Sequence, residues 1–220
     1  MKKRNLITSL HQSTKRNYIE RMVNDKVFAM KIAKNYDKSY WDGPRKFGYG
    51  GFKYMPGRLT SLAKKIIKTY NLKNSSRVLD VGCGKGYLLY EIKKFLPDIH
   101  LVGFDISSYA IKNSKSEIKK NIYKYDAAKK FRYKKNSFDL VMSFGTLHNL
   151  KLDKLFSCIK EIERVGKKNF IMVESYRNDQ ELFNLQCWAL TCETFLSTDQ
   201  WIWLYKHAGY GGDYEFIFFK

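Results

Sequence analysis

Proline, cysteine and histidine are scarce in this chain of 220 residues, which has three prolines, four cysteines and four histidines. The cysteines form no C-x-x-C pair and no cluster with histidine at metal-ligand spacing, so we expect reduced thiols and no metal site. No run approaches the roughly 20 apolar residues that cross a bilayer. The basic start, 1–7, lacks the apolar segment of a secretory signal. We therefore expect a cytoplasmic protein without a membrane span.

Acidic residues are also few, with 21 Asp and Glu against 41 Lys and Arg, which gives a formal net charge of +20. Such a charge raises the hypothesis of a nucleic-acid or membrane-surface partner. The excess is mostly lysine and is scattered, as in Lys64-Lys65 and Lys129-Lys130, and forms no arginine-rich arm. A generally solvated surface and attraction to polyanions or phosphorylated substrates both stay open, and the scatter does not favour a nucleic-acid partner.

The length suits one α/β domain with a short appendage. We expect an N-terminal part, residues 1–58, with a helix and an aromatic lid or strap, and a main domain, residues 59–220. Ser13-Thr14 is a candidate cap for a helix with apolar residues on one side: Ile19, Met22, Val23, Val27 and Ile32. The stretch 40–58 is rich in aromatic and turn residues and matches neither helix nor strand.

Strands and helices alternate from Arg77 onward, which is typical of a doubly wound, mostly parallel sheet with helices on both faces. Strands are expected over 77–81, 99–104, 121–125, 138–144, 169–174 and 214–219. Apolar periodicity predicts helices over 59–70 and 152–162. A capping box, Ser197-Thr198-Asp199-Gln200, predicts one more.

The most informative stretch is Asp80-Val81-Gly82-Cys83-Gly84-Lys85-Gly86, between the apolar pair Val78-Leu79 and a helical pattern. It predicts a strand that ends at a carboxylate, a glycine turn and a helix. Glycine permits positive φ and lets a ligand lie against the backbone. The first helical turn offers free N–H groups to an anion. A tight turn without a ligand is the structural alternative.

Spacing and charge distinguish two classes of cofactor at this turn. A dinucleotide fingerprint requires G-x-G-x-x-G, whereas the third glycine here comes one residue early. Asp80 would also face a pyrophosphate with like charge, at a cost of about 4 kcal/mol for a 4 Å separation and an effective dielectric near 20. A cofactor that carries an ammonium and a sulfonium is favoured instead.

The stretch resembles motif I of the class I S-adenosylmethionine-dependent methyltransferases, an acid followed by x-G-x-G-x-G. The resemblance covers roughly 59–220. It implies a Rossmann-like fold, S-adenosylmethionine as cofactor, S-adenosylhomocysteine as product and no metal. The family usually ends its sheet with an antiparallel pair, of which one terminal strand is visible here, so we expect an antiparallel C-terminal strand.

The resemblance also implies which residues contact the cofactor. Asp105, 25 positions after Asp80, corresponds to the carboxylate that binds the ribose hydroxyls, with a helix-capping acid as the alternative. Asp126-Ala127-Ala128 resembles motif III, where a carboxylate can accept from the adenine amino group, with a plain loop acid as the alternative. The full implied set is Asp80, Gly82, Cys83, Gly84, Gly86, Asp105, Ile106, Asp126, Ala127 and Ser143.

His148 follows a segment, 137–150, that resembles the family's fourth strand. It is the candidate general base, although a packing histidine is the alternative and in-line methyl transfer needs no dedicated base. The aromatic stretch 40–58 resembles the lids of small-molecule methyltransferases, and a packed strap is its alternative. The candidate substrate-binding residues are Trp41, Arg45, Tyr49, Tyr54, Arg58, Tyr176 and Arg177.

These features predict a methyltransferase acting by direct displacement on O or N of a small anionic metabolite, such as a nucleotide-activated sugar or surface-glycan precursor. An RNA methyltransferase is the second hypothesis, and a cofactor-binding regulatory or scaffold protein without turnover is the third. The chain lacks N/D-P-P-Y/F after the fourth strand, the RNA cytosine-C5 nucleophile and an Asp-Asp-Asn cluster. These absences argue against three other methyltransferase classes. The oligomeric state is not predicted.

Overall fold

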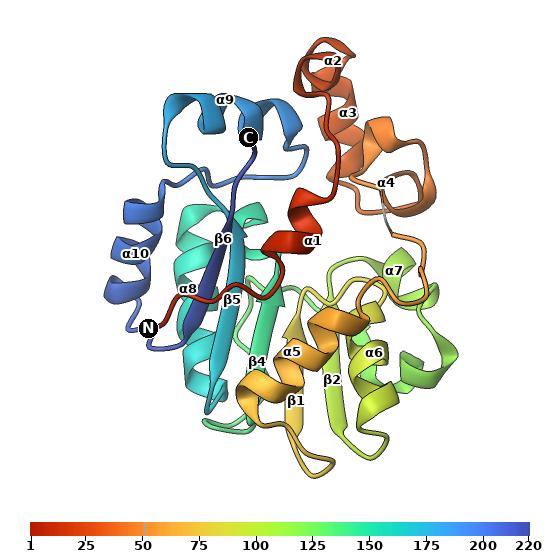
Figure 1. The fold of residues 1–220 in the computed structure, drawn as a ribbon, viewed down its shortest axis with the longest axis vertical. Helices are drawn as coiled ribbons and strands as arrows, with labels where there is room; N and C mark the ends of the chain where they lie inside the picture. Colours follow the sequence, from red (N-terminus) through yellow and green to blue (C-terminus); the bar gives the residue numbers. More distant parts are fainter. Residues whose placement is uncertain (51) are drawn as a thin grey trace.

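The fold is built on one six-stranded sheet, in the order β3-β2-β1-β4-β5-β6 (Figure 1). A computed structural model describes residues 1–50 and 52–220. Every neighbouring pair of strands is parallel. The strands are β1 (Arg77–Val81), β2 (His100–Asp105), β3 (Ile122–Lys124), β4 (Leu140–Phe144), β5 (Asn169–Glu174) and β6 (Asp213–Ile217).

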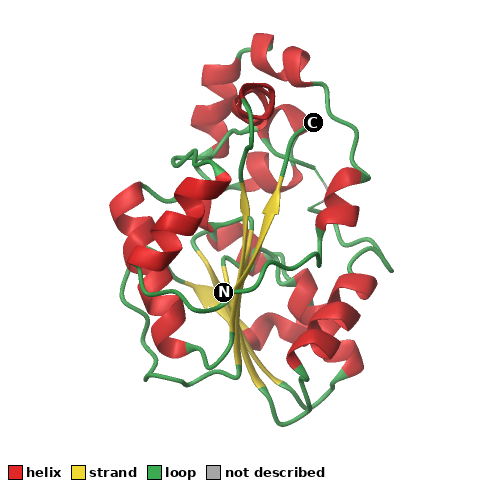
Figure 2. Ribbon diagram, turned by 60° about the vertical axis from the view of Figure 1, so that its left-hand side comes forward, coloured by secondary structure: helices red, strands yellow, loops and turns green. Residues whose placement is uncertain are grey.

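Helices lie on both faces of the sheet (Figure 2). One apolar cluster joins the sheet to α8 and α10, and a second joins its opposite face to α5 and α6. None of the helices within 1–50 and 52–220 has the length and apolarity needed to cross a bilayer. The α-helices are α1 (Thr8–Gln12), α2 (Tyr18–Val23), α3 (Lys26–Ala33), α4 (Lys38–Asp42), α5 (Thr60–Tyr70), α6 (Tyr87–Phe95), α7 (Ser108–Lys112), α8 (Leu152–Val165), α9 (Asp179–Trp188) and α10 (Thr198–His207). Short 3-10 helices span Arg45–Phe47, Ser116–Asn121 and Leu147–Asn149.

The predicted doubly wound, mostly parallel α/β sheet is confirmed, but the predicted antiparallel C-terminal strand is wrong. β6 runs parallel to β5, in a register from Phe170 opposite Asp213 to Glu174 opposite Ile217. The connection between these strands contains α9 and α10, and it returns the chain to the end of the sheet at which β5 begins. A parallel neighbour requires such a crossover, whereas a short hairpin would give an antiparallel one.

The N-terminal helix predicted from Ser13-Thr14 is also wrong in its extent. The segment forms α1, α2 and α3, and Asn17 caps α2 by accepting from the Glu20 N–H. The helix breaks before α3 because Asp25 takes a left-handed conformation, with φ of 53°. The expected apolar side is largely exposed, notably at Ile19, Val23 and Val27, and does not face a core. The division of the chain at residue 58 stays a prediction.

A buried carboxylate on β6 anchors the start of the chain. Glu215 is 1% exposed and accepts from the backbone N–H of Leu6 at 2.7 Å and of Thr8 at 2.9 Å, and from the Thr8 hydroxyl at 2.7 Å. Beside it, the Arg4 N–H donates to the Tyr214 carbonyl at 2.8 Å. The N-terminal segment is therefore attached along the outer edge of β6, close to the start of α1.

We expect Glu215→Ala to lower the free energy of unfolding by about 3 kcal/mol, because several donors to a buried charge lose their acceptor together. Urea denaturation measures this change, and Asp153→Ala, on an exposed site of α8, is the control. A loss no larger than that of the control would show that Glu215 does not hold the N-terminal segment.

Candidate active site

The turn between β1 and α6 brings the backbone close to two other segments. Gly84 has φ of +54°, and a Cβ at this position would lie 2.8 Å from the Trp41 ring. Gly82 has φ of +77°, and its Cβ would lie 2.1 Å from the Thr146 hydroxyl oxygen. Only glycine fits both the conformation and the space, so the turn is shaped for close approach.

Two buried carboxylates stand at the carboxyl ends of β1 and β2. Asp80 is 4% exposed and Asp105 is 9% exposed. Asp105 accepts from the backbone N–H of Gly84 at 2.9 Å and of Ser107 at 2.8 Å. Burial raises the pKa of Asp80 to about 8, with a further contribution from the charge of Asp105. Burial also raises the pKa of Asp105, against the effect of its hydrogen bonds.

Neither carboxylate has a cationic side chain within 4 Å in the described part of the chain. Keeping both ionised is costly in this environment, because burial and like charge both favour protonation. A cation placed beside them would remove that cost. The electrostatics of the turn therefore favour a positively charged ligand.

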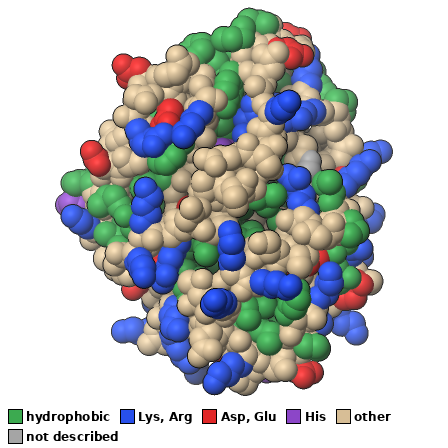
Figure 3. Space-filling view, viewed as in Figure 1, with side chains coloured by type: hydrophobic (Ala, Val, Ile, Leu, Met, Phe, Trp, Pro, Cys, Tyr) green, Lys and Arg blue, Asp and Glu red, His purple; other side chains and the backbone are tan. Residues whose placement is uncertain are grey.

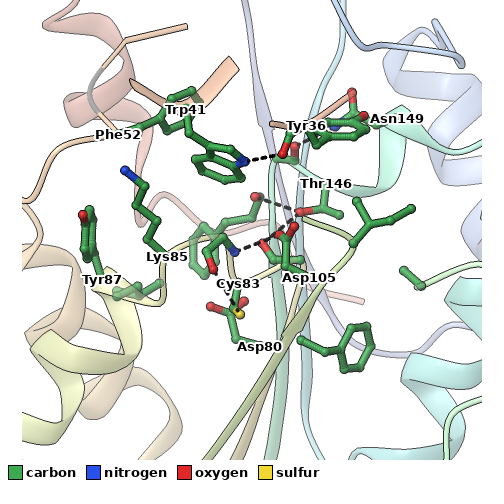
Figure 4. A pocket seen from close by; sticks show the side chains of 18 of the residues that line it. Tyr36, Trp41, Phe52, Asp80, Cys83, Lys85, Tyr87, Asp105, Thr146 and Asn149 are labelled. Carbon is green, nitrogen blue, oxygen red and sulfur yellow. Dashed lines mark hydrogen bonds between the residues drawn. The ribbon is translucent and has the colours of Figure 1, made fainter. Parts of the chain in front are cut away.

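A cavity of about 410 Å³ opens beside these carboxylates (Figure 4). Eight of the ten predicted cofactor residues line it: Asp80, Gly82, Cys83, Gly84, Asp105, Ile106, Asp126 and Ala127. The other two lie behind the lining. Gly86 precedes α6 with φ of +69°, and the buried Ser143 hydroxyl donates to the Val81 carbonyl at 2.9 Å. The contacts of all ten with a cofactor stay predictions.

The N-terminal part covers this cavity. The Trp41 indole N–H donates to the Tyr36 carbonyl at 3.1 Å (Figure 4). It also donates to the Ser107 hydroxyl at 2.8 Å. Lys85, in the glycine turn, is buried and pairs with Asp42 at 2.7 Å. Tyr36, Trp41 and Phe52 thereby line the cavity from the side opposite the sheet.

Trp41 is the one predicted substrate residue in the lining of this cavity. The other six predicted substrate residues do not line the cavity: Arg45, Tyr49, Tyr54, Arg58, Tyr176 and Arg177. Tyr54 donates to Glu91 at 2.5 Å, and Arg177 forms an ion pair with Glu181. The Tyr49 hydroxyl accepts from the Leu190 N–H at 2.8 Å. These partners account for the three side chains within the fold. The contact of all seven residues with a substrate stays a prediction.

His148 lies behind the cavity wall and does not line it. Its side chain is 3% exposed, and burial lowers its pKa despite the nearby Glu174 carboxylate. The Nδ1 atom accepts from the Glu174 N–H at 3.4 Å, and Nε2 lies 3.4 Å from the Glu174 carboxylate. A base at this position would have to act at a distance from the cavity. The base role of His148 stays a prediction, and these contacts explain the residue as a packed histidine.

The prediction missed an apolar part of the cavity lining. Apolar residues of three separate segments form it: Ile7, Leu59, Leu62 and Phe144. Thr146, Asn149 and Leu150 add the loop after β4. The presence of that loop in the site can be predicted from the sequence, because ligands bind beyond the carboxyl ends of parallel strands. No sequence signal places Ile7 in the site, because its position depends on the Glu215 anchor.

We expect Asp80→Asn to raise the melting temperature at pH 8 by at least about 4 °C. An acid whose pKa is higher in the folded than in the unfolded state destabilises the fold as pH rises from the unfolded value, near 3.8, to about 8. The asparagine side chain does not ionise, so the gain in melting temperature must be smaller at pH 5 than at pH 8. Thermal melts at both pH values measure it, and an equal change at the two would exclude an uncompensated Asp80.

Comparisons with known proteins agree with this geometry. A family model described as a methyltransferase domain matches residues 72–209. Ribosomal RNA small subunit methyltransferase C of Buchnera aphidicola is 30% identical over 104 residues, which cover 44% of this chain and 31% of that protein. Malonyl-[acyl-carrier protein] O-methyltransferase of Bacillus cereus is 29% identical over 96 residues, 41% and 35% of the two chains. The matched region spans about a third of these relatives.

A solved structure shares the fold. The S-adenosylmethionine-dependent methyltransferase from Archaeoglobus fulgidus superposes with a TM-score of 0.54 and 22% identity, over 68% of each chain. The family model covers more than half of this sequence, including the glycine turn and both buried carboxylates. The chain therefore belongs to the class I S-adenosylmethionine-dependent methyltransferases, the family whose cofactor is S-adenosylmethionine.

Proposed function

We propose that this protein transfers a methyl group from S-adenosylmethionine to an oxygen or nitrogen of a small anionic molecule. The observation that carries the proposal is the pair of buried carboxylates, Asp80 and Asp105, facing a cavity without a cationic partner among the described residues. A cationic cofactor supplies the missing charge, whereas a pyrophosphate would add to the repulsion.

The lining residues fit this cofactor. We assign Asp80 to its ammonium and Asp105 to the ribose hydroxyls, because both carboxylates line the cavity. Ile106 and Ala127 offer apolar contact, and Asp126 lies beside them with a carboxylate for the adenine amino group. The cofactor, when bound, supplies an electrophilic methyl carbon on a sulfonium. The chain itself must orient the acceptor in line and exclude water.

The cover supports a small acceptor. Tyr36, Trp41 and Phe52 lie over the cavity, and two contacts attach this cover to the cofactor side: Trp41 to Ser107, and Asp42 to Lys85. These side chains exclude water and restrict the space from which an acceptor approaches. A folded RNA would need the cover to move, whereas a metabolite needs only a place within the cavity.

An RNA acceptor is the second candidate. The net charge of +20 favours attraction to a polyanion. Several of the similar curated proteins are ribosomal RNA methyltransferases by name. Malonyl-[acyl-carrier protein] O-methyltransferase, by contrast, is named for methylation at oxygen of an acyl group.

The test is a screen of metabolite and RNA pools with methyl-labelled S-adenosylmethionine. We expect label in the acidic small-molecule fraction, because the covered cavity suits an acceptor of that size. Label confined to the RNA fraction would replace the leading proposal with the second one. Tight cofactor binding without label in any pool would instead indicate a cofactor-binding protein without turnover.

Asp105→Ala is the matched variant for this screen. It should weaken cofactor binding more than tenfold by calorimetry and abolish labelling, because the ribose hydroxyls lose a bidentate acceptor. Asp153→Ala, an exposed acid on α8, is the control. Unchanged affinity in a folded Asp105→Ala protein would remove the ribose assignment.

A further inference from the structure

A second cavity, of about 500 Å³, lies between α2 and α9, apart from the proposed methyl-transfer site. Lys and Arg side chains are scattered over the face of the molecule in Figure 3, so surface charge alone marks no site. This cavity differs because five cationic side chains and one carboxylate share its lining. They are Lys15, Arg16, Arg21, Arg45, Lys46 and Glu20.

Three arginines of this cavity gather on one indole. The guanidinium carbons of Arg16, Arg21 and Arg45 lie 5.4, 4.2 and 5.4 Å from the Trp188 ring centroid. None of the three forms an ion pair with a carboxylate of the described residues, and Lys46 has one at 3.7 Å, to the exposed Asp25. Contact with the indole face offsets only part of the repulsion among three like charges.

Backbone carbonyls hold these arginines in place. Arg21 donates to the carbonyls of Trp188 at 2.8 Å, Gly48 at 2.8 Å and Arg45 at 3.1 Å. Within residues 1–50 and 52–220, the Arg45 side chain makes one hydrogen bond, to the Lys15 carbonyl at 3.3 Å, and most of the five N–H donors of its guanidinium have no partner there. The cluster is thus fixed by neutral partners, with donors and net positive charge left over.

We propose that this cavity binds the phosphoryl group of a phosphorylated small molecule. Guanidinium groups match phosphate oxygens with paired, charge-assisted hydrogen bonds, and a multiply charged anion balances several arginines at once. The proposal goes beyond methyl transfer because the site is separate. Tyr49 packs between Trp188 and Tyr40, with ring centroids 6.2 and 6.0 Å away, and only Tyr40 lines the first cavity.

The test is calorimetry of inorganic pyrophosphate binding at low ionic strength. We expect measurable binding that weakens at least tenfold in the K15A/R45A protein, which loses the two exposed cations of the cavity and keeps the anchored Arg21. The K134A/K135A protein removes equal charge from an exposed loop and should bind like the parent. Equal losses in both variants, or no binding by the parent chain, would overturn the proposal.

A second measurement needs no variant. Pyrophosphate should protect Arg45 from modification by phenylglyoxal, read by mass spectrometry, while the exposed Arg132 reacts at an unchanged rate. Unprotected Arg45 would contradict the proposal, and protection by an RNA oligonucleotide at far lower concentration would replace it with a nucleic-acid site. The affinity for S-adenosylmethionine is measured in the same samples. A protein that does not bind S-adenosylmethionine would contradict the proposed function. A protein that binds S-adenosylmethionine but not pyrophosphate would contradict only the proposed phosphoryl site.

Discussion

Two carboxylates at the ends of adjacent strands, buried with no cationic side chain of the described residues beside them, are the constraint on which the site depends. The Asp105 carboxylate accepts hydrogen bonds from the backbone N–H groups of Gly84 and Ser107, and it thereby fixes the glycine turn. Asp80 accepts no such hydrogen bond from the part of the chain that the structure describes, and burial keeps its pKa near 8. The fold therefore retains an electrostatic cost that a cationic ligand removes, and ligand binding must stabilise the folded chain.

The covering segment depends on the same turn. Lys85 lies between two glycines of the turn and pairs with Asp42 of α4, and Trp41 packs where Gly84 has no side chain. The N-terminal segment also reaches the cavity through Ile7, which lines it and whose backbone N–H donates to the Glu215 carboxylate. Residues that precede the methyltransferase domain thus complete its cavity.

The sequence predicted the sheet well because its signals were local. Buried apolar runs and the capping box at Ser197 identify strands and a helix from neighbouring residues alone, and eight of ten predicted cofactor residues line the cavity. The predictions failed where contacts between segments far apart in the sequence determine the structure. The direction of β6 follows from the crossover through α9 and α10, and α9 was not predicted despite its cap at Asn178. Only the folded chain brings Arg16, Arg21 and Arg45 onto Trp188.

Calorimetry with two ligands tests whether the buried carboxylates select a cationic cofactor. S-adenosylmethionine and NAD share an adenosine but differ in the charge placed at the turn. We expect the protein to bind S-adenosylmethionine, and to bind NAD at least a hundredfold more weakly. NAD binding as tight as that of S-adenosylmethionine would contradict it.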